Sequence, residues 1–199
     1  MPTPFARTEI LLGKEVLAGL QQFNVLLVGL GGVGGQAAEL LGRSGIGRMT
    51  IVDHDRVAPS NLNRQLVALH STLGRKKTEV MAERLADANP ELQLTVTDLF
   101  VENHLIEPLL TAQPYDYVID CIDSIACKAQ LVATAQQLKL PVISAMGAGN
   151  RIDPSRARIT TLKKTHHCAL AREMRDQLRR LGASLDYPVV FSDEPSRQP

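Results

Sequence analysis

The chain has 199 residues, of which 44% are hydrophobic and 22% charged, and its formal net charge is +1. This length and composition allow one sizeable apolar core and exclude a disordered or low-complexity polypeptide. No apolar run approaches the roughly 18 residues of a membrane span and no secretory signal pattern is present, so we expect a cytoplasmic protein without membrane association. The three cysteines have no CxxC spacing, so we expect neither a disulfide framework nor a zinc site.

Apolar runs alternate with segments of helical periodicity along most of the chain. The runs are 25–30, 49–53, 92–96, 115–120 and 141–146, and the helical segments are 33–43, 75–88 and 124–138. This alternation predicts the α/β class, as a doubly wound, Rossmann-like, mostly parallel sheet with helices on both faces. After Gly147 the pattern changes and predicts a C-terminal antiparallel extension, with a strand at 156–162 and a helix at 168–182.

We expect one domain with an N-terminal helical segment (1–22), a nucleotide-binding core (23–147) and a basic C-terminal extension (148–199).

Charge is distributed unevenly between these parts of the chain. Residues 151–182 hold nine Lys/Arg against three Asp/Glu, a net +6 that leaves −5 for the rest. Such a segment can attract a polyanion, although many charged segments are simply solvated. The polar tail at 192–199 is expected to be loosely held.

A glycine cluster follows the first apolar run and opens the first helical segment. Gly29, Gly31, Gly32 and Gly34 stand in the sequence GLGGVG. Glycines at such a position let backbone N–H groups approach a phosphate at the positive end of a helix. Asp53 ends the next strand, at the usual place for a carboxylate that accepts hydrogen bonds from ribose hydroxyls. Together they predict a bound nucleotide, and they fit NAD, FAD or ATP equally.

Polar side chains farther along the chain favour ATP. A pyrophosphate is held largely by backbone amides, whereas the roughly four negative charges of ATP require cationic side chains and a metal ion. The candidates are Asn61, Arg64 and Gln65 in SNLNRQ, Arg75, Lys76 and Lys77 in GRKK, and Asp120 and Asp123 in DCIDS. Because the carboxyl ends of parallel strands meet at one edge of a sheet, we expect these groups to form one site for ATP and Mg²⁺.

The assembled motifs resemble the ThiF/MoeB superfamily of adenylating enzymes, which is related to the ubiquitin-activating enzymes. The motifs are, in order, GLGGVG, DHDRV, SNLNRQ, GRKKTEVMAERL with its following NP, and DCIDS. Within the superfamily the chain is most similar to the tRNA threonylcarbamoyladenosine dehydratases. That similarity rests on RTEILLGKE (7–15), GRSGIG (42–47), SAMGAGNRIDP (144–154), KTHHCALAREMR (164–175) and VVFSDEP (189–195).

The resemblance implies a single ThiF-type domain over residues 1–199 and a role for each matching residue. The implied ATP-binding set is Gly29, Gly31, Gly32, Gly34, Asp53, Asp55, Asn61, Arg64 and Lys77. Within it, Gly31 and Gly34 line the phosphates, Asp53 holds the ribose, and Arg64 and Lys77 contact the triphosphate. Asp123 binds Mg²⁺, and Arg7 matches an arginine that enters the partner subunit's ATP site, which implies a homodimer. Relatives continue past VVFS into a stretch ending in an apolar helix, so the extension 148–199 is expected to be shorter than theirs.

The implied activity is ATP-dependent activation of the carboxylate of threonylcarbamoyladenosine, beside the tRNA anticodon, followed by cyclising dehydration. The implied catalytic residues are Arg7, Arg64, Lys77 and Asp123. Two alternatives stay open. The first is an adenylyltransferase for the C-terminal glycine of a sulfur-carrier protein, with a sulfur-transfer protein as a partner. The second is a nucleotide-sensing module that binds without turnover.

Two further expectations concern the helix predicted at 168–182 and the cysteines. Arg172, Arg175 and Arg179 share the face opposite an apolar stripe of Leu170, Met174, Leu178 and Leu181, which predicts a face for tRNA phosphates. Because a group of the substrate itself can attack the activated carboxylate, the reaction needs no enzymic nucleophile. Cys121, at a strand end, and Cys127, in an apolar helical pattern, are predicted to be core residues. Cys168 follows two histidines at a helix start, where the pKa of a thiol can be lowered, but packing is the favoured interpretation.

Overall fold

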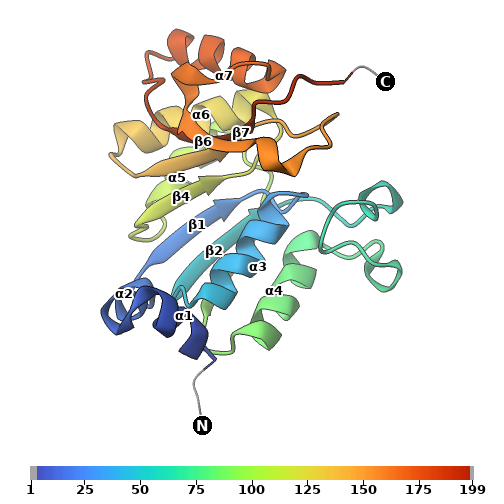
Figure 1. Ribbon diagram of the computed structural model, residues 1–199, viewed down its shortest axis with the longest axis vertical. Coiled ribbons are helices and arrows are strands. Elements are labelled where there is room, and N and C mark those ends of the chain that lie inside the picture. The colour runs from blue at the N-terminus through green and yellow to red at the C-terminus, as the bar shows by residue number, and fades with distance from the viewer. Residues whose placement is uncertain (1–3, 198–199) are drawn as a thin grey trace. The chain divides into compact units, whose positions relative to one another are not determined.

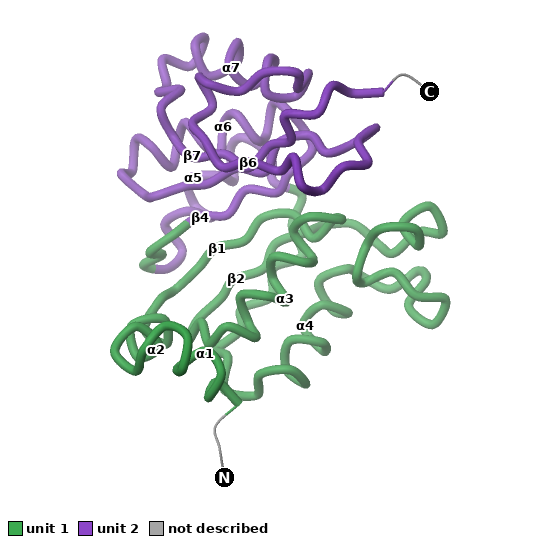
Figure 2. Tube along the Cα trace, viewed as in Figure 1, with its two compact units in different colours: residues 1–100, 114–117 green, residues 101–113, 118–199 purple. Residues whose placement is uncertain are grey.

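The protein is described here by a computed structural model that covers residues 4–197 (Figure 1). The chain divides into two compact units (Figure 2). Unit 1 holds residues 1–100 and 114–117, and unit 2 holds residues 101–113 and 118–199. The single domain with three segments, expected from the sequence, stays a prediction.

Unit 1 is built on three parallel strands in the order β3-β2-β1. Its elements are α1 (Ala6–Leu12), α2 (Lys14–Leu20), β1 (Asn24–Val28), α3 (Gly34–Ser44), β2 (Arg48–Asp53), the 3-10 helices η1 (Pro59–Asn61) and η2 (His70–Thr72), α4 (Lys77–Ala88) and β3 (Gln93–Asp98). All of β1 is buried, and so is β2 after Arg48, as the continuous apolar runs predict for strands covered on both faces. The third strand, β3, is mostly exposed because it lies at the edge.

The helices of unit 1 pack on these strands and on one another. Helices α3 and α4 contact each other, and they contact β1 and β2 respectively. Glu39 of α3 accepts a hydrogen bond from Arg84 of α4 at 2.6 Å, and this bond holds the pKa of Glu39 below its ordinary value. Gly47, before β2, lies so close to the chain that a Cβ built on it would be 1.8 Å from the carbonyl oxygen of Gln21. This close approach requires glycine.

Unit 2 contains strands in the order β4-β5-β7-β6, of which β4, β5 and β7 are parallel and β6 is antiparallel to β7. Its elements are α5 (Asn103–Thr111), β4 (Tyr117–Asp120, whose first residue belongs to unit 1), α6 (Ile125–Gln137), β5 (Val142–Ala145), η3 (Pro154–Arg156), β6 (Ala157–Thr161), η4 (Leu162–Lys164), α7 (Ala169–Arg180) and β7 (Pro188–Ser192). Helix α6 packs against both α5 and α7. The predicted antiparallel C-terminal extension is confirmed.

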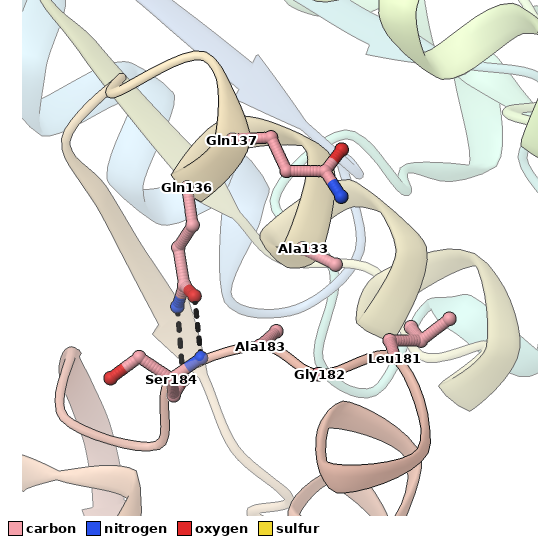
Figure 3. A pocket seen from close by; sticks show the side chains of 7 residues that line it. All are labelled: Ala133, Gln136, Gln137, Leu181, Gly182, Ala183 and Ser184. Carbon is pink, nitrogen blue, oxygen red and sulfur yellow. Dashed lines mark hydrogen bonds between the residues drawn. The ribbon is translucent and has the colours of Figure 1, made fainter.

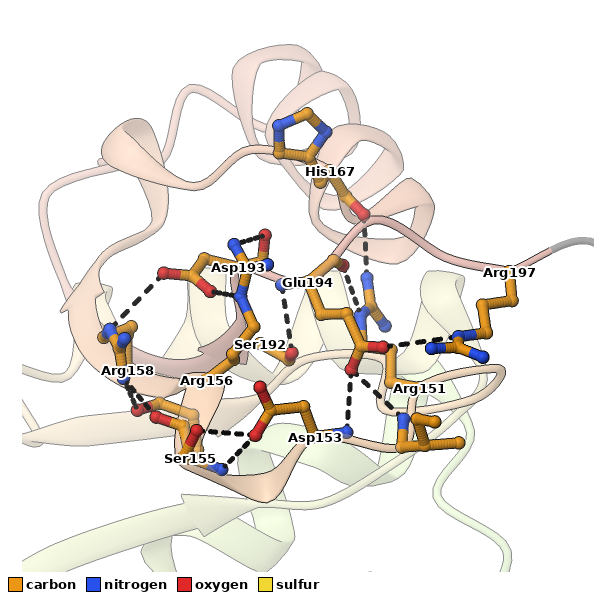
Figure 4. A network of polar contacts seen from close by, with 12 residues as sticks. Arg151, Asp153, Ser155, Arg156, Arg158, His167, Ser192, Asp193, Glu194 and Arg197 are labelled. Carbon is orange, nitrogen blue, oxygen red and sulfur yellow. Dashed lines mark hydrogen bonds and ion pairs between the residues drawn. The ribbon is translucent and has the colours of Figure 1, made fainter.

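The tail is tied down as far as it is described, which corrects the expectation of a loosely held segment (Figure 4). The buried carboxylate of Glu194 accepts hydrogen bonds from the N–H groups of Ile152 and Asp153 at 3.1 and 3.0 Å. Arg151 donates to the carbonyl oxygens of Glu194 and His167 at 3.0 and 2.7 Å. One arginine and one glutamate therefore connect the loop after β5, the segment before α7 and the tail. Residues 198–199 lie outside the described range.

A shallow pocket of about 220 Å³ lies in unit 2, where α6 and α7 end (Figure 3). Gln136 closes one side of it, since its side-chain amide exchanges two hydrogen bonds with the backbone of Ser184, at 2.8 and 3.0 Å. None of the site residues expected from the sequence lines this pocket. Within residues 4–197, no helix combines the length and the apolar character needed to cross a membrane.

Candidate nucleotide-binding site

The glycine loop between β1 and α3 has the backbone geometry of an anion-binding turn. Gly29 has a φ of 95°, a left-handed conformation that glycine adopts without steric cost, and its N–H donates to the carbonyl oxygen of Val52 at 2.8 Å. Helix α3 then begins at Gly34 with no side-chain cap and no acidic residue in its first turn. The positive end of the helix is therefore left for an anionic ligand.

Asp53 connects the end of β2 to this loop. One of its carboxylate oxygens accepts a hydrogen bond from the N–H of Leu30 at 2.6 Å, and the other accepts one from the N–H of Asp55 at 2.8 Å. Each oxygen keeps a second lone pair. Asp53 thus orders the glycine loop and can still accept a hydrogen bond from a ribose hydroxyl.

Residues of the segment after β2 lie over the glycines. A Cβ built on Gly32 would lie 3.6 Å from Cγ of Arg64, and one built on Gly31 would lie 4.0 Å from Nε2 of Gln65. The Oε1 atom of Gln65 is buried and has no hydrogen-bond partner among the described residues. Burying a hydrogen-bond acceptor without a partner costs free energy. Oε1 of Gln65 therefore fits a binding site in which a ligand supplies the missing donor.

Arg64 and Asn61 are currently bonded to their own segment. The guanidinium of Arg64 is exposed and donates to the carbonyl oxygen of Ser60 and to Oδ1 of Asn63, both at 2.9 Å. Oδ1 of Asn61 accepts the N–H of Ala58 at 3.0 Å, which holds the turn that carries Arg64. Arg64 must exchange exposed hydrogen bonds to reach a phosphate, and such bonds contribute little.

Lys77 is the buried cation of the GRKK motif. Its side chain is 5% exposed and its ammonium lies 2.6 Å from Oδ2 of Asp55, while its N–H donates to the carbonyl oxygen of Asp55 at 3.0 Å. Arg75 pairs instead with Glu83, and Lys76 pairs with Asp98. The structure therefore brings Lys77, Asp55 and Asp53 together in unit 1.

Asp123 belongs to unit 2 and follows β4. It is exposed, and its carboxylate takes part in none of the hydrogen bonds or ion pairs that connect residues 4–197. A free carboxylate at the end of a strand has the chemistry of a Mg²⁺ ligand. Nearby, the structure contains a fully buried ion pair between Asp120 and Lys128. Lys128 was not among the residues predicted from the sequence, although a lysine three residues after Ile125 and four before Val132 was a signal that it faces the core.

The cysteines and the helix arginines differ in part from expectation. Cys168 is buried and its sulfur accepts the N–H of Ala171 at 3.5 Å, so it caps α7 as a packed residue. Cys121 and Cys127 are half-buried rather than core residues, and burial raises the pKa of Cys121 to about 12. Arg175 donates to Thr165 and is not free on the basic face.

On the apolar face of α7, Met174 and Leu178 are buried as predicted, Leu170 is half-buried, and Leu181 is exposed. Arg172 and Arg179 are exposed, with one acidic neighbour each, Glu173 at 3.7 Å and Asp176 at 2.8 Å. Arg7 is exposed on α1. Of the three arginines expected on the RNA face, two are therefore exposed.

The class of protein follows from comparison with known families. The ThiF family matches residues 5–184, so the chain belongs to the ThiF family. It is 42% identical over 190 residues to the tRNA threonylcarbamoyladenosine dehydratase of Bacillus subtilis, covering 96% of this chain and 74% of that protein. It is also 42% identical over 175 residues to the protein of that name from Escherichia coli, covering 88% of this chain and 65% of that protein.

A solved structure extends the likeness to three dimensions. The crystal structure of the Escherichia coli tRNA N6-threonylcarbamoyladenosine dehydratase in complex with ATP matches with a TM-score of 0.94 and 39% sequence identity, covering 98% of this chain and 83% of that chain. The predicted α/β, Rossmann-like, mostly parallel fold with an antiparallel C-terminal pair is thereby confirmed.

Proposed function

We propose that this ThiF-family protein is an ATP-dependent enzyme that activates the carboxylate of threonylcarbamoyladenosine in tRNA and cyclises it with loss of water. The observation that carries the proposal is the likeness, over nearly the whole chain, to a dehydratase solved with ATP. ATP transfers an adenylyl or phosphoryl group to the carboxylate. This transfer turns a carboxylate oxygen into part of a leaving group. The attacking atom comes from the substrate's own side chain, so proximity replaces an enzymic nucleophile.

The roles of the protein groups follow from their surroundings. The uncapped start of α3 and the glycine loop are assigned to the phosphates, and Asp53 to the ribose. Lys77 and Arg64 are assigned to charge that develops on the phosphates, because fixed cations in a partly buried site stabilise such charge. Asp55 pairs with Lys77, and Asn61 holds the turn that carries Arg64. Asp123 is assigned to Mg²⁺ on the chemistry of its free carboxylate.

A homodimer is part of the proposal. Helix α1, which carries Arg7, exposes Ile10 and Leu11 to 77% and 81% of their surface, and α2 exposes Val16. Adjacent apolar side chains of this size favour a protein contact. The sulfur-carrier adenylyltransferase and the sensing module remain the rival functions, a sulfur-transfer protein remains a possible partner, and the cytoplasmic location stays a prediction.

The deciding experiment uses tRNA that carries threonylcarbamoyladenosine. With ATP and Mg²⁺, mass spectrometry of the released nucleosides should record the loss of one water. Lys77→Ala should lose contacts to phosphate of about 1.5–3 kcal/mol, which corresponds to ATP binding that is weaker by about tenfold to 150-fold. Lys76→Ala is the matched control, since that lysine pairs with Asp98 and should leave ATP binding unchanged.

ATP–pyrophosphate exchange separates the rivals. Exchange stimulated by a sulfur-carrier protein, with no change in the tRNA nucleosides, would assign the chain to the carrier branch. ATP binding without exchange or product under any condition would leave a sensing module. Equal ATP binding by the Lys77→Ala and Lys76→Ala variants would remove Lys77 from the site.

A further inference from the structure

Lys128 is a fully buried lysine whose ammonium meets three acceptors. It lies in α6, and its Nζ is 2.9 Å from Oδ2 of Asp120, 2.9 Å from the carbonyl oxygen of Ile122 and 3.4 Å from the carbonyl oxygen of Asp120. An ammonium has three N–H donors and no acceptor. The three donors of Lys128 are therefore matched by three acceptors, all from the end of β4 and the loop after it.

Stability alone does not account for this arrangement. Taking two charges out of water is costly, and a buried ion pair is often no more stabilising than apolar side chains of the same volume. An apolar side chain at position 128, however, could not hold two backbone carbonyl groups. The specific effect of Lys128 is on the backbone that follows β4.

That backbone is fixed from both sides. Oδ1 of Asp120 accepts the N–H of Ile122 at 3.1 Å, while Lys128 holds the carbonyl oxygen of the same residue. The N–H of Lys128 also donates to the carbonyl oxygen of Ser124 at 2.9 Å, in the first turn of α6. The one residue between these anchored positions whose side chain is exposed and carries a charge is Asp123.

We propose that Lys128 is a positioning residue that fixes the 120–122 backbone, so that the carboxylate of Asp123 is presented to Mg²⁺ in one orientation. This inference rests on the proposed function, in which Asp123 binds the metal. Lys128 does not touch the metal or the nucleotide in this proposal. Its effect passes through the carbonyl oxygen of Ile122 to the neighbouring residue.

The same cluster provides a control. Besides Lys128, Oδ2 of Asp120 has a second partner, because the hydroxyl of Ser144 donates to it at 2.6 Å. The hydroxyl of Tyr187 in turn donates to Ser144 at 3.3 Å. Tyr187 is buried like Lys128 and belongs to the same network, but within residues 4–197 its hydroxyl donates to Ser144 and not to the 121–123 backbone. Tyr187→Phe therefore perturbs the network without releasing the loop.

The test measures binding of ATP by calorimetry across a Mg²⁺ titration, using the full chain. Lys128→Met should raise the Mg²⁺ concentration needed for half-maximal binding by about tenfold or more, the usual effect of losing a group that supports a metal ligand. Binding of ATP in the presence of EDTA should not change. Tyr187→Phe should leave the Mg²⁺ dependence unchanged, and Asp123→Asn should shift it at least as far as Lys128→Met. Adding Lys128→Met to Asp123→Asn should cause no further shift.

The outcomes distinguish the positioning role of Lys128 from the metal-binding role of Asp123. A Mg²⁺ dependence shifted by Asp123→Asn but not by Lys128→Met would overturn the positioning role alone. No shift with Asp123→Asn would instead remove Asp123 from the metal site, and the inference with it. If Lys128→Met fails to fold, Asp120→Asn/Lys128→Met keeps the cluster neutral and should show the same shift. An additive further loss in the Asp123→Asn background would mean that Lys128 acts by another route and would also overturn the proposal.

Discussion

Asp53 orders the backbone around the glycine loop and is also the residue proposed to hold the ribose. Its carboxylate holds the glycine loop through Leu30 and the segment after β2 through Asp55. Any substitution at this position would disturb the glycine loop as well as the acceptor proposed for the ribose. For this reason Lys77, whose partner Asp55 is half exposed, is the better residue for testing the nucleotide site.

A pair of glycines in unit 1 provides a test of the packing. Gly47→Ala should destabilise the protein by about 1–3 kcal/mol, because its Cβ would overlap the carbonyl oxygen of Gln21 and force the backbone to move. Gly19→Ala is the control. Gly19 lies inside α2 with open space around it, so alanine should stabilise the helix by roughly 0.5–1 kcal/mol. Urea unfolding of both variants measures the difference, and similar stabilities would contradict the close approach at Gly47.

At the scale of the element, α7 combines a buried stripe with a partly solvated face. Arg172 and Arg179 are exposed, and their neighbours Glu173 and Asp176 form surface pairs of the kind that contribute little. Arg175 is different, since its guanidinium bonds to Thr165 and connects α7 to the segment before it. Of the three arginines on the predicted RNA face, two are therefore exposed and one supports the fold.

The salt dependence of tRNA binding tests this division of roles. Changing Arg172 and Arg179 together to Gln should reduce the slope of the logarithm of the binding constant against the logarithm of salt concentration by about one to two units, because fewer counterions are released. Arg175→Gln should leave the slope unchanged and lower the melting temperature instead. Fluorescence anisotropy with labelled tRNA measures the slope. A salt response that is flat in the native protein would exclude this face as an RNA surface.

The order and type of the elements could be predicted from the sequence because they depend on local patterns. Apolar runs and helical spacing identified most strands and helices to within a few residues, although not α5 or β7, and the glycine cluster was correctly placed between β1 and α3. The same patterns do not reveal a strand's place in a sheet. The run at 92–96 is apolar enough to suggest burial, yet β3 lies at an edge and is mostly exposed.

The features that could not be predicted depend on partners far apart in the chain. The polar composition of the tail at 192–199 predicts a loosely held segment, but the partners of Glu194 are residues 152 and 153. Lys128 was overlooked because lysine is normally solvated, and only the fold brings it to the carbonyl oxygens of Asp120 and Ile122. The catalytic assignments of Arg64, Lys77, Asp123 and Arg7 stay predictions.

For the whole molecule, the proposed homodimer makes a quantitative prediction. If Arg7 acts in the partner's site, a mixed dimer of one Arg7→Ala subunit and one Asp123→Asn subunit contains one complete site. Random mixing of two inactive variants should then restore about a quarter of native dehydration activity, since half of the dimers are mixed and each has one of two sites intact. Native mass spectrometry verifies the mixed dimers. If they form and remain inactive, Arg7 does not act across the interface.

The connection between Glu194 and the loop after β5 also affects how the chain folds while it is being made. Glu194 is added to the growing chain 42 residues after Ile152 and 41 residues after Asp153, whose amides it binds. At a synthesis rate of about 5–20 residues per second, roughly 2–8 s pass before that acceptor exists. During this interval the amides of Ile152 and Asp153 cannot form the hydrogen bonds that they make in the folded protein. The 147–153 loop therefore reaches its final conformation after the strands of unit 1 have already left the ribosome.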